Sequence, residues 1–455
     1  MLDMTPVKVA ERKALRINPC KTCQPVGAMY CALGVRSCMP HSHGSQGCCS
    51  YHRTVLSRHF KEPAIASSSS FTEGASVFGG RSNVSTAVKN VFDIYAPDII
   101  AIHTTCLSET IGDDVKSYIM DMEIPEGKQV VHCNTPSYVG SHINGFSNMM
   151  MGFMDYLIDP ADGSAAGKTA LFPGWVNPGD VREIKRIAGL MGAECICFPD
   201  HSGVLDAPMT GKYELYPDGG TTLPEIRALG GCSQLIALGE ITSAPPAQLL
   251  TKKWHVPEVL LPTPVGVAFT DRYILALRQC TKREVPRALE EQRGQLVDLM
   301  LDAHAYTSGK TAAIFGDPDI VIGMTSLCLE MGLVPKYVIT GTPREEFGVK
   351  VNALFDAYHV TGCRAKANAD LFELHQWIKN EPVDLLIGST YGKQIAKAED
   401  IPFVRVGFPV LDRYGGTLLP VVGYVGGIRM AEKITDALMD RRDRDAADED
   451  LEIVM

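Results

Sequence analysis

The sequence predicts an α/β protein with three Rossmann-like, doubly wound domains and mainly parallel sheets. Two observations support this prediction. The 455 residues are about three times the usual length of one domain. The chain also repeats one pattern three times: a buried-strand run, a turn, a helix, and a second run that ends at a proline corner. Strands that alternate with helices at this spacing are typical of parallel sheets.

The three copies share one layout. In the order strand, helix, second strand, the elements are expected at 98–102, 113–119 and 130–137, at 234–238, 247–252 and 256–264, and at 383–387, around 394 and at 401–409. A linker rich in Gly, Ala and Asp at 160–167 precedes a strand at 169–172, and an amphipathic helix at about 287–305 precedes another strand at 311–317. These features predict domains at 1–160, 161–305 and 306–455, the last with a charged tail.

Composition limits the function classes. A hydrophobic content of 45% is enough for several cores, and a net charge of -10 without a basic block argues against nucleic acid or an anionic membrane as the main partner. The sequence has no run of 18 apolar residues and no hydrophobic region near its start. We therefore expect a cytoplasmic protein, whose fourteen cysteines are thiols or metal ligands rather than disulfides.

Cysteines are concentrated near the start of the chain. Six of the fourteen lie between Ile17 and Tyr51, a density typical of metal or redox chemistry. Cys23 precedes Gln-Pro-Val-Gly and Cys48 ends a Gly-rich run, so both are expected on tight turns. Cys106 follows the apolar run 98–102, so it is expected at the exit of a buried strand, where α/β proteins place their chemistry. A zinc pair formed by Cys20 and Cys23 is a weaker alternative.

Other patterns have simpler interpretations. The segment 163–169 resembles a phosphate loop, but it has three residues between its glycines instead of four, and it precedes a strand. Cys49 is expected to point away from Cys48. The remaining cysteines are expected to pack as small apolar groups: Cys31, Cys38, Cys133, Cys195, Cys197, Cys232, Cys280, Cys328 and Cys363.

Four segments carry a family resemblance. They are KTCQPVGA at 21–28, HGSQGC at 43–48, TTCLSETIGDD at 104–114 and NTPSYVGSH at 134–142. Together they closely resemble the β subunit of the nitrogenase molybdenum-iron protein, in a form without a long N-terminal extension. The likeness extends from about Arg16 to the helix after Gly427 and includes GDPD at 316–319 and VGFPVLDRY at 406–414.

The resemblance implies specific roles. In that family the β subunit supplies half the ligands of the P-cluster, an eight-iron, seven-sulfur centre shared with the α subunit in an α2β2 tetramer. The matching positions are Cys23, Cys48 and Cys106, with Ser137 as a ligand of the oxidised cluster and Tyr51 beside it. Soft thiolate ligands agree with an iron-sulfur centre. The iron-molybdenum cofactor belongs to the α subunit, so this chain is expected to relay electrons for dinitrogen reduction.

Two further sites follow from the same resemblance. Phe78 matches an aromatic residue at the surface where the ATP-hydrolysing iron protein docks. Asp298 and Asp302 lie four residues apart, which places both carboxylates on one helical face. Without the family this pair suggests a solvated acidic face. With it, the pair resembles a divalent-cation site, Fe or Ca, between two β subunits, completed by Glu62 and the Lys61 carbonyl of the other copy.

Several alternatives stay open from sequence. A cofactor-assembly scaffold is expected to keep fewer of the cluster cysteines, and a dark-operative protochlorophyllide reductase subunit lacks this serine pattern. The β subunit of a vanadium or iron-only nitrogenase is expected to have HGGQGC, whereas this chain has Ser45. Outside the family, a zinc-binding structural protein is the remaining candidate.

Overall fold

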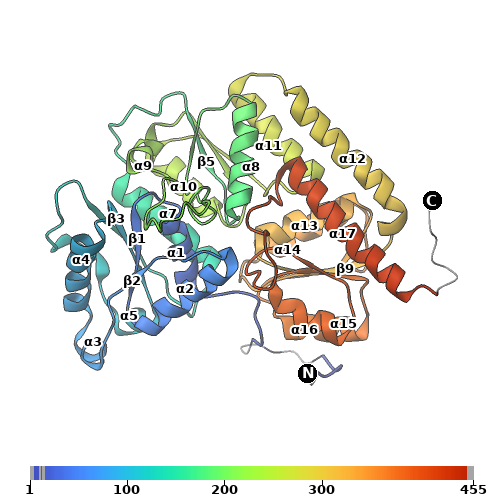
Figure 1. The fold of residues 1–455 in the computed structure, drawn as a ribbon, viewed down its shortest axis with the longest axis horizontal. Helices are drawn as coiled ribbons and strands as arrows, with labels where there is room; N and C mark the ends of the chain where they lie inside the picture. Colours follow the sequence, from blue (N-terminus) through green and yellow to red (C-terminus); the bar gives the residue numbers. More distant parts are fainter. Residues whose placement is uncertain (1–4, 10–11, 13–15, 448–455) are drawn as a thin grey trace. The chain divides into compact units, whose positions relative to one another are not determined.

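Three parallel sheets organise the chain (Figure 1). The structure, a computed structural model, describes residues 5–9, 12 and 16–447. The chain forms two compact units. We call Thr22–Leu261 with Leu275–Glu284 the N-terminal unit, and Met1–Lys21, Pro262–Ile274 and Val285–Met455 the C-terminal unit. Every strand pairing within the three sheets is parallel, so the predicted fold class is confirmed.

The N-terminal unit contains two of the sheets. The first has the order β2-β1-β3-β4, and the second has the order β6-β5-β7-β8. The strands are β1 (Cys38–His43), β2 (Ser67–Ser68), β3 (Ile99–Thr104), β4 (Gln129–Cys133), β5 (Thr169–Phe172), β6 (Cys195–Cys197), β7 (Gln234–Leu238) and β8 (Glu258–Leu261). The helices are α1 (Gln24–Leu33), α2 (Gln46–Phe60), α3 (Glu73–Phe78), α4 (Arg81–Tyr95), α5 (Cys106–Ile111), α6 (Val115–Met120), α7 (His142–Leu157), α8 (Pro178–Leu190), α9 (Leu223–Ala228), η1 (Leu229–Gly231) and α10 (Ala244–Trp254).

The C-terminal unit has one five-stranded sheet in the order β11-β10-β9-β12-β13. Its strands are β9 (Thr311–Gly316), β10 (Val334–Thr340), β11 (Arg364–Lys366), β12 (Leu385–Gly388) and β13 (Phe403–Arg405). Its helices are α12 (Arg287–Thr307), α13 (Pro318–Glu330), α14 (Glu346–Ala357), α15 (Leu371–Asn380), η2 (Thr390–Gly392), α16 (Lys393–Ala398) and α17 (Gly423–Asp445). Helix α11 (Gly266–Thr281) contributes residues to both units.

The predicted strands follow the apolar runs. Residues 99–102 of β3 are completely buried, because helices cover both faces of a parallel sheet. The runs at 169–172, 234–238 and 311–316 also form strands. The predicted three-domain boundaries stay a prediction, since two sheets share the N-terminal unit. The end of the predicted charged tail lies at 448–455, outside the described residues.

Strand β1 escapes sequence prediction because its residues, CMPHSH, are not an apolar run. It pairs with β3 over six residues, from Cys38 opposite Ile99 to His43 opposite Thr104. Its two buried histidines stay within the sheet because serine hydroxyls satisfy them. His41 hydrogen-bonds Ser67 at 2.9 Å and Ser69 at 2.8 Å, and His43 hydrogen-bonds Ser69 at 2.9 Å.

Candidate metal centre

Three neighbouring strands of the first sheet end at one edge and lead to candidate ligands. Strand β1 leads to Cys48, the third residue of α2, and β3 leads to Cys106, the first residue of α5. Strand β4 leads to the turn that contains Ser137. Because β1, β3 and β4 are adjacent and parallel, their carboxyl ends lie side by side. The sheet therefore brings together the ligands predicted after its strands.

Cys23 reaches this region through close packing of α1 against α7. A Cβ atom on Gly27 would lie 1.7 Å from the His142 carbonyl oxygen, and one on Gly145 would lie 1.8 Å from the Gln24 carbonyl oxygen. Only glycine permits this approach of two helix backbones. The segment before α1 is also fixed, because the His142 N–H donates to the Thr22 carbonyl at 3.0 Å and the Thr22 N–H donates to His142 Nδ1 at 3.2 Å. These contacts hold Cys23 in place as the N-cap residue of α1.

The Ser137 turn is tied to the same helix. Gln24 Nε2 donates to the carbonyls of Pro136 at 3.1 Å and Val139 at 2.7 Å, on either side of Ser137. Within the described part of the chain, the Ser137 hydroxyl makes no hydrogen bond. The usual structural role of serine in a turn, a side-chain bond to the backbone, is therefore not what places it here.

The three thiols converge. Cys48 and Cys106 lie close enough for each thiol to oppose ionisation of the other. Burial, with smaller contributions from Cys48 and Cys106, raises the pKa of Cys23 to about 11. Burial and the neighbouring Cys106 also raise the pKa of Cys48. Thiols so close together resist ionising side by side, so this arrangement favours thiolates only when a cation accompanies them.

Two predictions about local structure are wrong. Cys23 and Cys48 do not lie on free tight turns but at the starts of α1 and α2, with Pro25 in the first turn of α1. Proline fits there because the first helical N–H groups have no partner within the helix. Ser45 caps α2 by accepting a hydrogen bond from the Gly47 N–H at 3.3 Å. Helix N-termini favour negative charge, so both positions suit thiolate ligands better than turns would.

A buried polar frame fixes the strand ends. The Thr135 N–H donates to Thr104 Oγ1 at 2.7 Å, and Thr135 Oγ1 donates to the Thr104 carbonyl at 2.6 Å. Ser108 Oγ accepts from the Thr105 N–H at 2.9 Å and donates to the His43 carbonyl at 2.8 Å. These bonds link the ends of β1, β3 and β4, and they set the positions of the segments that follow.

Sequence reasoning missed three residues of the site. His52 Nε2 lies 3.3 Å from Cys23 Sγ, and the neighbouring Cys106 raises the pKa of Tyr138. Gln24 anchors the Ser137 turn. Gln24 and Tyr138 each stand next to a predicted ligand in the sequence, which was the available signal. His52 had only the α2 helix spacing of four residues from Cys48.

The other predicted site residues lie at varied distances from the thiols. Tyr51 is half-exposed in α2, and its pKa is raised by partial burial and by Cys23 nearby. Phe78, at the end of α3, is 91% exposed, which excludes core packing. Asp298 and Asp302 are exposed on α12, and neither has an ion pair or hydrogen bond among the described residues.

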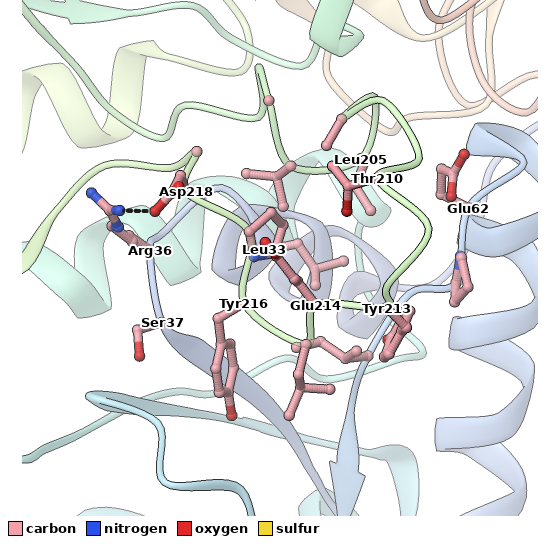
Figure 2. Close-up of a pocket in the computed structure, with 18 of the residues that line it drawn as sticks. Leu33, Arg36, Ser37, Glu62, Leu205, Thr210, Tyr213, Glu214, Tyr216 and Asp218 are labelled. Carbon is pink, nitrogen blue, oxygen red and sulfur yellow. Dashed lines mark hydrogen bonds and ion pairs between the residues drawn. The ribbon is translucent and has the colours of Figure 1, made fainter.

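Lys61 and Glu62 follow α2, with Lys61 as its C-cap in a left-handed conformation. Glu62 lines a cavity of about 380 Å³ that none of Cys23, Cys48 and Cys106 lines. Figure 2 shows Glu62 across this cavity from the ion pair of Arg36 and Asp218. The cavity is therefore separate from the thiol site.

Most other cysteines pack as predicted. Those that are buried are Cys31, Cys38, Cys49, Cys133, Cys197, Cys232 and Cys328, whereas Cys195, Cys280 and Cys363 are only partly buried. Cys20 packs in the apolar core of the C-terminal unit with Ala313 and Phe315, which argues against a zinc pair with Cys23. The segment 163–169 precedes β5 as predicted, unlike a phosphate loop.

Two features are absent from the described residues. No group of three or more His, Cys, Asp or Glu side chains there is arranged to hold a single metal ion. In the same residues, no helix combines the length and apolar character needed to cross a bilayer.

This fold and cysteine-lined sheet edge define a class of protein. Residues 23–439 match the profile of the nitrogenase component 1 type oxidoreductases. The sequence is 56% identical over 458 residues to the nitrogenase molybdenum-iron protein beta chain of Clostridium pasteurianum, with all of both chains covered. It is 40% identical to the corresponding chain of Frankia alni, covering 97% of this chain and 86% of that one. The chain therefore belongs to the family of nitrogenase molybdenum-iron protein β chains, which are subunits of an oxidoreductase complex.

Solved structures agree. The structure described as nitrogenase Cp1 at pH 6.5 contains a chain that matches with a TM-score of 0.98, 56% identity and complete coverage of both chains. Another chain, from nitrogenase Cp1 at pH 5, matches with a TM-score of 0.70 but only 15% identity, over 96% of this chain and 92% of that chain. The second match shows a shared fold alone. The family resemblance predicted from sequence is thus confirmed.

Proposed function

We propose that Cys23, Cys48 and Cys106 are this chain's ligands to a P-cluster, an eight-iron, seven-sulfur centre shared with the α subunit. The observation that carries the proposal is the convergence of three partly buried thiols at one sheet edge. Three thiols are too few for eight irons, so the remaining ligands must come from the α subunit of an α2β2 tetramer. When bound, such a cluster takes up and releases electrons.

The chain's own residues prepare this site. The N-termini of α1 and α2 offset part of the cost of a thiolate at Cys23 and Cys48, whose pKa values burial raises, and a bound cation supplies the rest. His52 contacts Cys23, while Gln24 holds the turn that presents Ser137. Ser137 has a hydroxyl without a hydrogen-bond partner among the described residues, so it is available as an oxygen ligand of the oxidised cluster. Tyr51 lies beside Cys23.

In this role the chain relays electrons from the ATP-hydrolysing iron protein to the iron-molybdenum cofactor of the α subunit, where dinitrogen is reduced to ammonia. We assign docking of the iron protein to the surface around α3, because Phe78 and Val77 are 91% and 74% exposed there. An exposed aromatic side chain of this kind is typical of a binding surface.

We also propose that Asp298 and Asp302 bind a divalent cation, Fe or Ca, between two β subunits, with Glu62 and the Lys61 carbonyl of the other copy. Oxygen ligands suit a hard cation. The carboxylates of Asp298 and Asp302 lie four residues apart on α12, exposed and without a partner among the described residues. One chain supplies too few ligands alone, which agrees with a site completed by a second copy.

The test compares the chain expressed alone with the chain co-expressed with its α subunit. We expect the full iron content of the cluster only in the co-expressed complex, measured by iron, molybdenum and vanadium analysis of the purified proteins. A stable monomer of this chain that carried all eight irons would show that the site is not a half-site. Vanadium in place of molybdenum would assign the complex to the vanadium nitrogenases.

A further inference from the structure

Asp113 is a buried carboxylate that three other elements share. Its side chain is 2% exposed. The Gly80 N–H donates to both of its oxygens at 3.1 Å, the Tyr118 hydroxyl donates at 3.0 Å, and His43 Nε2 donates at 3.0 Å. Hydrogen bonds to an ionised acceptor are about twice as strong as neutral ones. Asp113 therefore fastens together β1, α6 and the turn between α3 and α4.

On one side, Asp113 holds the base of α3. Gly80 separates α3 from α4, and the exposed Phe78 lies two residues before it. A Cβ atom on Gly80 would lie 2.2 Å from the ring of Phe71, so the turn is packed tightly against the body of the unit. Helix α3 also lies beside α5 in Figure 1. The Gly80 turn therefore connects the end of α3 directly to the Asp113 carboxylate.

On the other side, His43 is connected to the segments that contain Cys48 and Cys106. It is the last residue of β1, and Gly44 to Gly47 connect it to Cys48. Its carbonyl accepts hydrogen bonds from the Thr105 N–H at 3.0 Å and from Ser108 Oγ at 2.8 Å, in the first turn of the helix that begins at Cys106. A shift of His43 would displace Cys48 and Cys106 together.

We propose that Asp113 is a positioning residue that couples docking at α3 to the placement of Cys48 and Cys106. The proposal rests on the function proposed above and names a regulatory link within the same site. A partner that presses on α3 moves the Gly80 turn, the Asp113 carboxylate and His43 in sequence. A chain of buried hydrogen bonds of this kind transmits small shifts, because a packed interior deforms little.

The chain offers a matched control. Arg81, next to Gly80, forms an ion pair with Asp121 at 2.7 Å, and both side chains are more than half exposed. This pair also joins α4 to the end of α6, but it does not contact His43. Asp113→Asn keeps the shape of the side chain and removes its charge, whereas Asp121→Asn removes a charge at the surface.

The test is peptide-resolved hydrogen exchange on the purified α2β2 complex, with and without the nucleotide-bound iron protein. In the native complex, docking should slow exchange at least about threefold at 73–80 and also at 43–49 and 104–112. Asp113→Asn should keep the protection at 73–80 and lose it at the two cysteine segments, while Asp121→Asn should behave as native. Iron content of the same samples reports the cluster independently of this coupling.

Each of the other possible outcomes decides for or against a stated part of the proposal. Protection confined to 73–80 in the native complex, or an unchanged response in Asp113→Asn, overturns the coupling. Absence of protection at 73–80 overturns the docking surface and the coupling together, whereas missing iron with intact protection overturns only the cluster assignment. If Asp113→Asn does not assemble, Tyr118→Phe removes one donor to the carboxylate and keeps the ring. A reduced response at 43–49 then supports the proposal, and a full response contradicts it.

Discussion

The first sheet of the N-terminal unit and the sheet of the C-terminal unit are both parallel. They differ in how accessible the residues are at the carboxyl ends of their strands. In the first, the segments after β1 and β3 carry the partly buried thiols Cys48 and Cys106. In the second, the residues after β9, β10 and β12 are closed off: Asp317, Thr342 and Ser389 are 2%, 1% and 1% exposed. We call the first the open edge, since its thiols stay partly accessible, and the second the sealed edge, since its own chain covers these residues.

The difference shows that parallel-sheet topology alone does not make a functional edge. Both edges contain a buried hydroxyl without a hydrogen-bond partner among the described residues, Thr105 Oγ1 at the first. The first edge also has hydrogen bonds that position the candidate ligands, such as Ser108 Oγ on the His43 carbonyl. At the sealed edge, Ser389 Oγ is buried without a hydrogen-bond partner. Function follows from which side chains leave the strands and from whether they remain accessible.

The largest effect is expected from removing a thiol at the open edge. Cys106→Ala should abolish most of the cluster iron, because the proposed site takes one of its three thiolates from this residue. Cys328→Ala, in the sealed sheet's α13, should keep the iron and cost about 1 kcal/mol of stability, since Cys328 is 0% exposed and packs as an apolar group. Iron analysis and thermal unfolding of both complexes check this. Equal iron loss in the two variants would contradict the contrast.

Much of this fold could be predicted from the sequence, because its central strands are continuous apolar runs. The apolar run at 99–102 predicts β3, and the run at 385–387 predicts β12. Strand β1 could not be predicted in this way. Its proline and two histidines oppose a strand by local preference, and only pairing with β3 and bonds to Ser67 and Ser69 stabilise it.

The sequence supplied the candidate ligands of the proposed site, but not the contacts that hold them in place. Cys23, Cys48 and Cys106 stand in motifs that resemble a known family, so their types and spacing carried the information. The contacts that position them join residues far apart in sequence, such as Gln24 to the Pro136 and Val139 carbonyls. Such contacts depend on how α1 packs on α7, which local sequence patterns do not encode.

The two edges should also differ in how they tolerate loss of a buried hydroxyl. Ser108→Ala removes a hydroxyl that accepts from the Thr105 N–H and shares its one proton between the His43 and Thr105 carbonyls, so it should lower the free energy of unfolding by about 1–3 kcal/mol. Ser389→Ala removes a buried hydroxyl that has no partner, so it should be neutral or stabilising by about 1 kcal/mol. The midpoint of thermal unfolding of each complex measures both. A comparable loss in Ser389→Ala would mean that the sealed edge is also held by its polar groups.

A smaller effect is expected from neutralising the exposed carboxylates Asp298 and Asp302 on α12 of the C-terminal unit. Two carboxylates four residues apart repel by about 0.2–0.5 kcal/mol, so neutralising both should stabilise a bare helix slightly. If they bind a cation, Asp298→Asn with Asp302→Asn should instead speed dissociation of the tetramer, by about tenfold for each 1.4 kcal/mol lost. Subunit exchange measures the rate, with Glu290→Gln on the same helix as the control. A tetramer that dissociates no faster would contradict the bound cation.

The smallest effect is expected on the redox potential of the cluster, and it comes from a comparison of two proline corners. Pro136 is followed by Ser137 at the open edge, whereas Pro409 is followed by Val410, which is 8% exposed, in the C-terminal unit. A serine oxygen is a hard, anionic ligand when it binds iron, so Ser137 should stabilise the oxidised cluster more than the reduced one.

Ser137→Ala should therefore raise the midpoint potential of the oxidised couple, because oxidation loses that ligand. A preference of about 1.4 kcal/mol corresponds to about 59 mV for one electron. Redox titration followed by electron paramagnetic resonance measures the potential, with Ser137→Cys as a variant that keeps a ligand. Because the Ser137 hydroxyl has no hydrogen bond among the described residues, its loss should leave the turn intact. An unchanged potential in Ser137→Ala would show that Ser137 is a turn residue, equivalent to Val410 at the other corner.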